Sequence, residues 1–542
     1  MQKGLFTVLI LFCSFTMAQS NLGFTQDEFL RGSITAEREW WDLTFYHLDI
    51  EVQPDEKFIQ GKNTIRYKVL TPKEILQIDL QPPLKIEKIV QNGKELSYRK
   101  EGENAYMVLL VEEQKAGEEN EIVVHYSGQP KEAIRAPWDG GFSWKRDSNG
   151  KHFVATSCQG LGASVWWPNK DHMYDEVDSM AISVTVPKDL MNVSNGRLKG
   201  VEETETSKTT HWYVDSPINN YGVNVNIGDY VHFGEQFEGE NGVLDIDYYV
   251  LRENLEKAKE QFKQTKPMLE AFEHWFGPYP FYEDSFKLVE VPYLGMEHQS
   301  SVTYGNNYQN GYRGTDLSGS GWGLKFDFII IHEAGHEWFA NNITYKDIAD
   351  MWIHEGFTAY SENLFLDFHY GTKAAAEYVI GTRKRILNDR PIIGRYNLNQ
   401  RGSSDMYYKG ANMLHTLRQL IEDDEQWRQV LRGLNKAFYH QTVTTEQIEN
   451  YISEKTQKDL SAFFDQYLRN TQIPTLEYEF DGNQLQYRYV NVVNDFDMPV
   501  RIFVDGQPKW IFPKKNSEWK TEKVSGTEIT IDHNFYIESK AL

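Results

Sequence analysis

The sequence has almost no cysteine. Its 542 residues include two, Cys13 and Cys158. Cys13 lies in an apolar N-terminal segment that is expected to be removed, so we expect neither an intrachain disulfide framework nor a metal site built from several cysteines. Any metal ion must therefore be held by histidine and carboxylate side chains.

Positive charge is also scarce. There are 56 lysine and arginine residues against 79 aspartate and glutamate residues, which gives a formal net charge of −23. Because an acidic protein repels a phosphate backbone, the composition argues against general nucleic-acid binding. Hydrophobic residues make up 40% of the chain and aromatic residues 14%. That is enough for several buried cores, and it excludes a disordered or fibrous protein.

Long hydrophobic runs are missing after the N-terminus, so we expect no stable membrane span, which needs roughly 18 or more apolar residues. A shorter apolar run, Leu5–Phe15, ends near the small residue Ala18. This pattern is typical of a cleaved signal peptide over residues 1–18 and predicts export, either periplasmic or secreted. An uncleaved anchor is the alternative. Lipidation of Cys13 is disfavoured, because the bulky Phe12 stands where a small residue is expected.

Hydrophobic periodicity divides the rest of the chain into three domains, which gives a multidomain α+β fold class. Period-two alternation dominates residues 19–235 and predicts an N-terminal antiparallel β domain. Residues 236–471 mix strands with helical segments, and a glycine- and serine-rich loop is expected to lead into a helix near Leu324. Alternation returns over residues 472–542 and predicts a C-terminal β sandwich.

The decisive motif is His332-Glu333-Ala334-Gly335-His336, within a stretch of helical character. On a helix, His332 and His336 lie one turn apart on one face, so both imidazoles can bind one Zn²⁺. Glu333 then lies beside the metal, where it can take a proton from the attacking water. The motif therefore predicts hydrolysis. The alternative is a helix whose histidines merely cap it or cross a core.

A catalytic zinc needs a third protein ligand and an open fourth position. Glu355 is separated from His336 by eighteen residues and lies in a second helical segment. His354 is adjacent, but neighbours on a helix diverge by about 100°, so only one of the two can face the metal. Glu362, two turns further on the face of Glu355, is predicted to orient His332. An ordinary solvated glutamate is the alternative for Glu362.

These motifs resemble those of the zinc aminopeptidase family that includes aminopeptidase N and leukotriene hydrolase. The resemblance rests on the paired histidines, the gap to Glu355 and the flanking segments Trp338–Asn341 and Glu355–Glu362. It covers most of residues 25–470. It implies a thermolysin-like α/β catalytic domain that holds one Zn²⁺ per chain on His332, His336 and Glu355, with Glu333 as the general base. Thermolysin-like endopeptidases are similar only loosely, because their gap is typically one residue longer.

A second stretch, Leu294–His298, is similar to the family's Gly-x-Met-Glu-Asn signature. The resemblance implies that Glu297 binds the free α-ammonium of the substrate, beside Gly295 and Met296 in the substrate site. One carboxylate at the closed end of a cleft attracts a charged terminus and offers an internal peptide no partner. Leu294 and His298 depart from the family pattern, which affects the shape of the site but not its charge.

Three further segments match the family. Tyr407-Tyr408-Lys409-Gly410 resembles its Tyr-x-Lys-Gly motif, which implies that Tyr407 donates a hydrogen bond to the developing oxyanion, with Tyr408 as the alternative. Gln159 is similar to a family residue that helps to hold the amino group. Trp166–Asp171 resembles a family stretch that we interpret as packing near the site.

The sequence thus predicts an exported zinc aminopeptidase that acts on peptides with a free N-terminus. Longer relatives have a large helical domain that closes the cleft. The resemblance does not extend to such a domain, so we expect an open site that admits peptides longer than tripeptides. A thermolysin-like endopeptidase is the first alternative, and Glu297 argues against it. A non-catalytic peptide-binding module is the second, and intact Glu333 and Tyr407 argue against it. The motifs do not separate peptide from lipid substrates and predict no oligomeric state.

Overall fold

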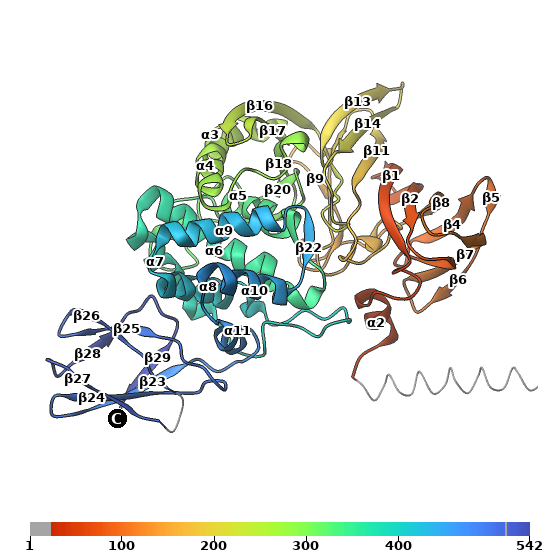
Figure 1. Ribbon diagram of the computed structural model, residues 1–542. Coiled ribbons are helices and arrows are strands. Elements are labelled where there is room, and N and C mark those ends of the chain that lie inside the picture. The colour runs from red at the N-terminus through yellow and green to blue at the C-terminus, as the bar shows by residue number, and fades with distance from the viewer. Residues whose placement is uncertain (1–22, 515–517) are drawn as a thin grey trace, which may run out of the picture.

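The computed structural model describes residues 23–514 and 518–542. An N-terminal β region, a central helical region and a C-terminal β region follow one another along the chain (Figure 1). This arrangement confirms the predicted multidomain α+β class. The predicted signal peptide and Cys13 lie outside the described residues. Within the described ranges, no helix is both long enough and apolar enough to cross a bilayer.

The N-terminal region contains an eight-stranded sheet in the order β13-β14-β11-β1-β2-β8-β4-β5 and two smaller sheets, β3-β7-β6 and β12-β15-β10-β9. Its strand pairs are antiparallel, as predicted, except that β1 and β11 pair in parallel, with Phe45 opposite Ser179. The long chain segment between these two strands makes a parallel pairing possible. The region comprises α2 (Gln26–Gly32), β1 (Trp41–Gln53), β2 (Phe58–Val69), β3 (Lys73–Asp79), β4 (Lys85–Gln91), β5 (Lys94–Glu95), β6 (Ser97–Glu101), β7 (Ala105–Gln114), β8 (Glu119–Gly128), β9 (Gly141–Arg146), β10 (His152–Ser157), β11 (Ser179–Pro187), β12 (Met191–Val193), β13 (Arg197–Glu203), β14 (Ser207–Val214) and β15 (Asn226–Gly228).

The central region begins with a mixed sheet in the order β16-β17-β18-β20-β19. Strand β16 runs across the boundary predicted at residue 235, and its hairpin partner β17 lies wholly beyond it. Helices then pack around this sheet (Figure 1). The elements are β16 (Tyr230–Gly239), β17 (Gly242–Leu251), α3 (Leu255–Gln261), α4 (Thr265–Phe276), β18 (Phe286–Glu290), β19 (Gly295–Met296), β20 (Val302–Tyr304), α5 (Phe328–Gly335), β21 (Ile343–Tyr345), α6 (Trp352–Tyr370), α7 (Thr372–Thr382), α8 (Tyr408–Ile421), α9 (Asp424–Ala437), β22 (Gln441–Val443), α10 (Thr445–Thr456) and α11 (Ser461–Leu468).

Helix α5, which carries the first histidine of the motif, starts at Phe328 rather than near Leu324. The reason is Asp327, whose side chain accepts hydrogen bonds from the first backbone N–H groups of the helix. The same carboxylate accepts hydrogen bonds of 2.7 Å from the Tyr304 hydroxyl and from the Gln261 amide. The cap therefore fixes α5 to β20 and to α3, which a local sequence pattern does not reveal.

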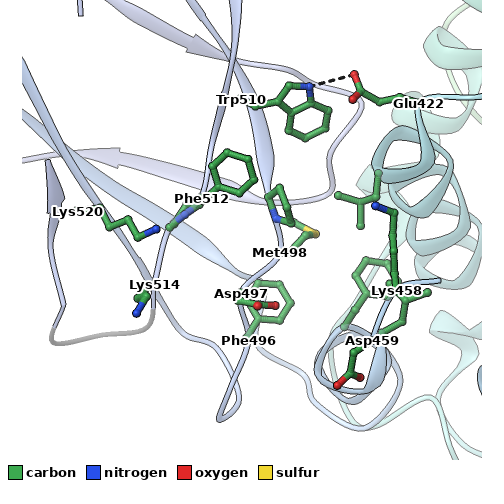
Figure 2. Close-up of a pocket in the computed structure, with 15 residues that line it drawn as sticks. Glu422, Lys458, Asp459, Phe496, Asp497, Met498, Trp510, Phe512, Lys514 and Lys520 are labelled. Atoms are coloured by element: carbon green, nitrogen blue, oxygen red, sulfur yellow. Dashed lines mark hydrogen bonds between the residues drawn. The ribbon is translucent and has the colours of Figure 1, made fainter. Parts of the chain in front are cut away.

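The C-terminal region consists of two sheets, β27-β24-β23-β29 and β26-β25-β28. Their apolar side chains continue the core of the helical region, because Leu476 and Val500 belong to the same buried cluster as Phe464 of α11. Figure 2 shows a pocket at this junction, where Trp510 donates a 3.0 Å hydrogen bond to Glu422. The strands are β23 (Thr475–Asp481), β24 (Gln484–Val490), β25 (Val500–Val504), β26 (Gln507–Ile511), β27 (Lys520–Lys523), β28 (Ile529–Ile531) and β29 (Glu538–Ala541).

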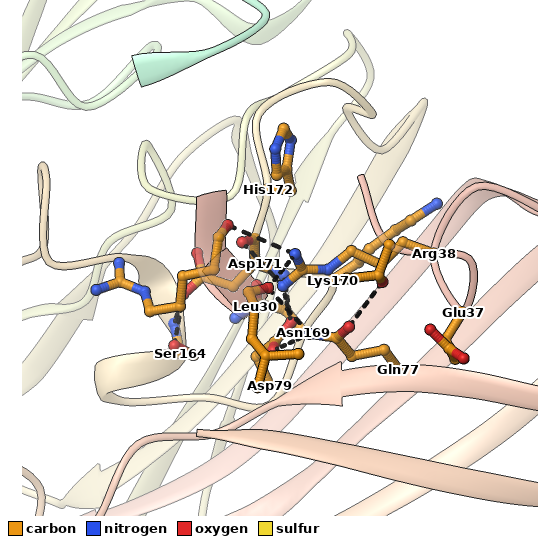
Figure 3. A network of polar contacts seen from close by, with 12 residues as sticks. Leu30, Glu37, Arg38, Gln77, Asp79, Ser164, Asn169, Lys170, Asp171 and His172 are labelled. Atoms are coloured by element: carbon orange, nitrogen blue, oxygen red, sulfur yellow. Dashed lines mark hydrogen bonds and ion pairs between the residues drawn. The ribbon is translucent and has the colours of Figure 1, made fainter. Parts of the chain in front are cut away.

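A buried ion pair anchors α2 to the N-terminal sheets (Figure 3). Arg38 Nη2 lies 2.6 Å from Asp79 Oδ2, and both side chains are 0% exposed. Arg38 also donates to the Leu30 carbonyl at 2.6 Å, while Gln77 and the backbone N–H of Asp171 donate to Asp79. The network joins α2, β3 and the Trp166–Asp171 segment, in keeping with the packing role inferred for that segment.

Removing one partner of this pair should destabilise the protein strongly. Asp79→Ala leaves the Arg38 charge buried without its carboxylate, which typically costs about 3–5 kcal/mol. The matched control is Glu121→Ala, because Glu121 pairs with Arg66 on the surface, where these side chains are 43% and 59% exposed, and such pairs contribute about 1 kcal/mol or less. Urea denaturation followed by tryptophan fluorescence measures both losses. Equal losses would contradict the structural role of the buried pair.

Candidate active site

The two motif histidines are held by different partners. Helix α5 ends at Gly335, and the backbone leaves helical geometry at Phe339. The Phe339 carbonyl lies 3.0 Å from His336 Nδ1, and Glu362 Oε1 lies 2.8 Å from His332 Nδ1. With both Nδ1 atoms engaged, each imidazole keeps Nε2 for a ligand. Glu362 thus lies within hydrogen-bond distance of His332.

Glu355 completes a group that fits a metal ion. Its Oε2 atom lies 3.4 Å from His336 Nε2 and 3.8 Å from His332 Nε2. Ligand atoms around a tetrahedral Zn²⁺, bound at 2.0 to 2.2 Å, stand about 3.4 Å apart. Glu355 Oε2 is also buried and has no hydrogen-bond partner among the described residues. A buried carboxylate oxygen without a donor is destabilising unless a cation faces it.

His354, the alternative ligand, faces elsewhere. Its Nε2 atom accepts a 2.8 Å hydrogen bond from the Tyr345 backbone N–H, and its Nδ1 atom lies 3.4 Å from the Tyr221 hydroxyl. Burial lowers the pKa of His354 well below its usual range, which keeps the imidazole neutral and able to accept that bond. Of these two neighbours in the sequence, it is therefore Glu355 that faces the paired histidines.

A close contact between two glycines brings Tyr407 near the histidines and Glu355. A Cβ atom on Gly410 of α8 would lie 2.9 Å from the Cα atom of Gly356 on α6, so this helix contact requires the absence of a side chain. Tyr407, the residue before α8, thereby reaches His332, and the two rings stack with their centroids 6.2 Å apart. Tyr408 lines the cavity in which the two histidines and Glu355 lie. Both tyrosines are thus present at the site.

Glu297 lies directly after β19, on a different element from the two histidines and Glu355. Gln159 Nε2 donates to Glu297 Oε1 at 2.5 Å and to Glu355 Oε1 at 2.9 Å. The Tyr221 hydroxyl also donates to Glu297 Oε1, at 3.2 Å. Gln159 and Tyr221 both belong to the N-terminal region. One glutamine from the N-terminal region therefore sets the positions of two carboxylates in the central region.

The residues around Glu297 have separate roles. Gly295 and Met296 line the cavity, and a Cβ atom on Gly295 would lie 2.7 Å from the Ile329 side chain of α5. Leu294 lines the cavity too, whereas His298 does not. The His298 side chain is buried, which lowers its pKa to about 3, and its Nδ1 atom lies 3.3 Å from the Thr303 hydroxyl. The departure at His298 is thus accommodated in the protein interior.

Burial dominates the electrostatics of the carboxylates. It raises the pKa of Glu333 to about 7 and also raises that of Glu297. Burial would raise the pKa of Glu355 as well, but the positive charges of His336 and His332 that face it outweigh burial and hold that pKa well below its usual range. Ligand atoms of Glu297, Glu333 and His336 lie within 4.8 Å of one another. The cavity therefore concentrates negative charge beside the histidines.

Nine of the ten residues predicted for the site line a single cavity of about 360 Å³, and the tenth, Glu362, lies behind His332. Sequence reasoning missed several other lining residues, notably Trp138, Tyr312, Arg385 and Arg401. Trp138 is 64% exposed at the cavity. Arg385 ends a short 3₁₀ helix and the other three lie in loops. None of these segments carries a recognisable motif, so only the tertiary fold brings them to the site.

Comparison with known proteins identifies the family. The model described as "Peptidase M1 N-terminal domain" matches residues 43–221, and the one described as "Peptidase family M1 domain" matches residues 260–467. Together the two ranges cover more than half of the chain. The chain belongs to peptidase family M1. The resemblance indicated by the motifs is thereby confirmed.

Individual M1 relatives are distant in sequence. Leukotriene A-4 hydrolase of Xenopus laevis is 22% identical over 446 residues, which are 77% of this chain and 69% of that protein. Probable aminopeptidase 1 of Sulfurisphaera tokodaii is 20% identical over 462 residues, 80% of this chain but 55% of that protein. The chain thus spans about half the length of that aminopeptidase. A mutant M1 zinc metallopeptidase of Deinococcus radiodurans has a similar fold, with a TM-score of 0.68, 20% identity and coverage of 81% of this chain and 96% of the other.

Glu362 should tune metal affinity although it does not line the cavity. Glu362→Ala removes the acceptor of His332 Nδ1, and loss of such an outer hydrogen bond typically weakens metal binding about 10- to 100-fold. Competition with a zinc chelator measures this change. Glu256→Ala is the control, because Glu256 is a glutamate of α3 that pairs with Lys259 on the surface. Unchanged affinity in Glu362→Ala would contradict this role.

Proposed function

We propose that this M1 peptidase is a zinc-dependent aminopeptidase that hydrolyses the N-terminal bond of peptides. One observation carries the proposal: Glu297, a buried carboxylate, is held by Gln159 beside the metal-binding group. No lysine or arginine in the described ranges forms an ion pair with Glu297. Its charge is thus available to the α-ammonium of a substrate, which an internal stretch of peptide does not have.

The chain's own residues supply the metal site. His332, His336 and Glu355 would hold the ion, with Glu362 and the Phe339 carbonyl fixing the two imidazole rings. When bound there, Zn²⁺ polarises the scissile carbonyl and lowers the pKa of water.

Glu333 is the proposed general base. It lies next to His332 in sequence, lines the cavity and is largely buried. Its carboxylate would accept the proton of the attacking water and deliver it to the departing amine. Tyr407 would donate a hydrogen bond to the oxygen that gains charge. Burial raises the pKa of the Tyr407 hydroxyl well above its usual range, so this hydroxyl keeps the proton that it must donate.

A structural neighbour supports a peptide substrate. The Deinococcus radiodurans M1 metallopeptidase has also been solved with the substrate Tyr-Ser-Ala, and that structure aligns with a TM-score of 0.66 and 20% identity over 81% of this chain. At this identity the likeness concerns the fold. The proposal for this chain therefore depends on its own residues, above all Glu297.

A panel of matched peptides tests the proposal. Zinc-loaded protein should release single residues from peptides with a free N-terminus and act poorly on N-acetylated versions of the same peptides. Glu333→Gln should retain zinc and lose several orders of magnitude in kcat, because an amide does not accept the proton. Efficient internal cleavage of blocked peptides, without N-terminal truncation products, would instead identify an endopeptidase.

The two tyrosines can be separated by substitution. Tyr407→Phe should lower kcat by roughly 10²- to 10³-fold with little change in KM, since one oxyanion donor is lost. Tyr408→Phe is the matched control and should have a mild effect. Steady-state kinetics on one free peptide measures both variants. A loss confined to KM in Tyr407→Phe would assign its hydroxyl to substrate binding instead.

A further inference from the structure

Two arginines line the active-site cavity without a carboxylate partner. Arg385 follows α7, and Arg401 lies in the loop that leads to α8. Arg385 Nε donates to the Leu317 carbonyl at 2.9 Å. Among the described residues, neither guanidinium has a carboxylate oxygen within the 4.0 Å of an ion pair. In a chain with 79 acidic residues against 56 basic ones, unpaired arginines in a cavity suggest an anionic ligand.

These arginines lie near the two tyrosines of the cavity. Burial raises the pKa of both tyrosines, and the charges of Glu355 and Glu297 raise that of Tyr407 further. The nearby positive charges of Arg401 and Arg385 oppose the increase at Tyr407 and Tyr408, respectively. Glu297, in contrast, comes from the loop after β19. Both arginines come from the connection between α7 and α8. The cavity therefore carries its ammonium-binding carboxylate and its arginines on different structural elements.

A short peptide has the same distribution of charge. It carries an ammonium group at one end and a carboxylate at the other, and each extended residue adds at most about 3.6 Å of length. The cavity volume of about 360 Å³ is near the lower end of the range for small-ligand sites. A short peptide thus carries both of the charges that the cavity can bind, and a cavity of this volume suits a small ligand.

We propose that Arg385 and Arg401 bind the C-terminal carboxylate of such a peptide, which makes di- and tripeptides the preferred substrate class. This inference rests on the proposed aminopeptidase function, because Glu297 must hold the opposite end. A longer peptide would place uncharged backbone at the arginines. An aspartate or glutamate side chain after the scissile bond offers the same chemistry, and the experiment separates these two sources of carboxylate.

The test compares Ala-Ala-Ala, its C-terminal amide and the amide of Ala-Ala-Glu. Wild-type kcat/KM should be roughly 3- to 30-fold higher for the acid than for its amide, as two solvent-screened ion pairs predict. This ratio should fall as salt is added. Rescue by Ala-Ala-Glu amide shows that an acidic side chain supplies the same carboxylate. A wild-type ratio near one would overturn the inference. The aminopeptidase proposal would still stand if the enzyme removed the first alanine of the amide. It would fail if the enzyme removed the first alanine of neither Ala-Ala-Ala nor its amide.

Variants assign the effect to the two arginines. Arg385→Met and Arg401→Met should each reduce the ratio of acid to amide, and the double variant should bring it close to one. Arg385→Lys should retain part of it, because a positive charge remains. The matched control is Arg99→Met, since Arg99 pairs with Glu101 on β6 of the N-terminal region and should leave the ratio unchanged. An unchanged ratio in the double variant would contradict binding of the C-terminal carboxylate. The same holds if the wild type prefers Glu-Ala-Ala amide to Ala-Ala-Ala amide and the double variant loses that preference.

Discussion

Three buried carboxylates share one cavity with two histidines, and this concentration of negative charge constrains the rest of the site. Glu297, Glu333 and Glu355 are each less than a tenth exposed. Like charges held together away from water raise the free energy unless cations or hydrogen-bond donors compensate them. Gln159 and Tyr221 supply donors, and the histidines face Glu355. The remaining charge suits two cations, a metal ion and the ammonium group of a peptide.

The fold brings these groups together from separate elements. Glu333 lies on α5, Glu355 on α6, and Glu297 follows the short strand β19. Gln159, which belongs to the N-terminal region, donates hydrogen bonds to Glu297 and Glu355. The site therefore requires the N-terminal region to pack against the central region. Glycine contacts between α6 and α8 bring Tyr407 to the same place. The metal-binding group could form within the helical region, but the complete substrate site needs both regions.

Helix periodicity explains which parts of the site could be predicted from the sequence. The spacing of His332 and His336, and the two turns from Glu355 to Glu362, follow from helical geometry, whereas the gap between His336 and Glu355 crosses β21. Glu297 and Tyr407 carry no such signal and were found through the family resemblance. Arg385 ends a short 3₁₀ helix and Arg401 lies in a loop, and neither periodicity nor a motif indicates that they reach the cavity. Export, which rests on residues 1–18, stays a prediction.

The fold shows the same division between local and tertiary signals. Alternation predicted the β regions, and a capping box formed by Thr444 and Gln447 opens α10. The start of α5 depends on Asp327, whose partners lie on β20 and α3, and the parallel pairing of β1 with β11 joins distant segments. Local patterns therefore predicted the elements, whereas long-range contacts fixed their limits and partners.

The effect of Glu297→Ala on one peptide, with its N-terminus free and N-acetylated, tests the central claim most directly. If the carboxylate pairs with the substrate ammonium, kcat/KM for the free peptide should fall by an amount equivalent to about 2–5 kcal/mol, while cleavage of the acetylated peptide should not worsen. Zinc content should stay the same in both proteins. Equal losses on the two peptides would contradict the account, because Glu297 would then act on the reaction without recognising the N-terminus.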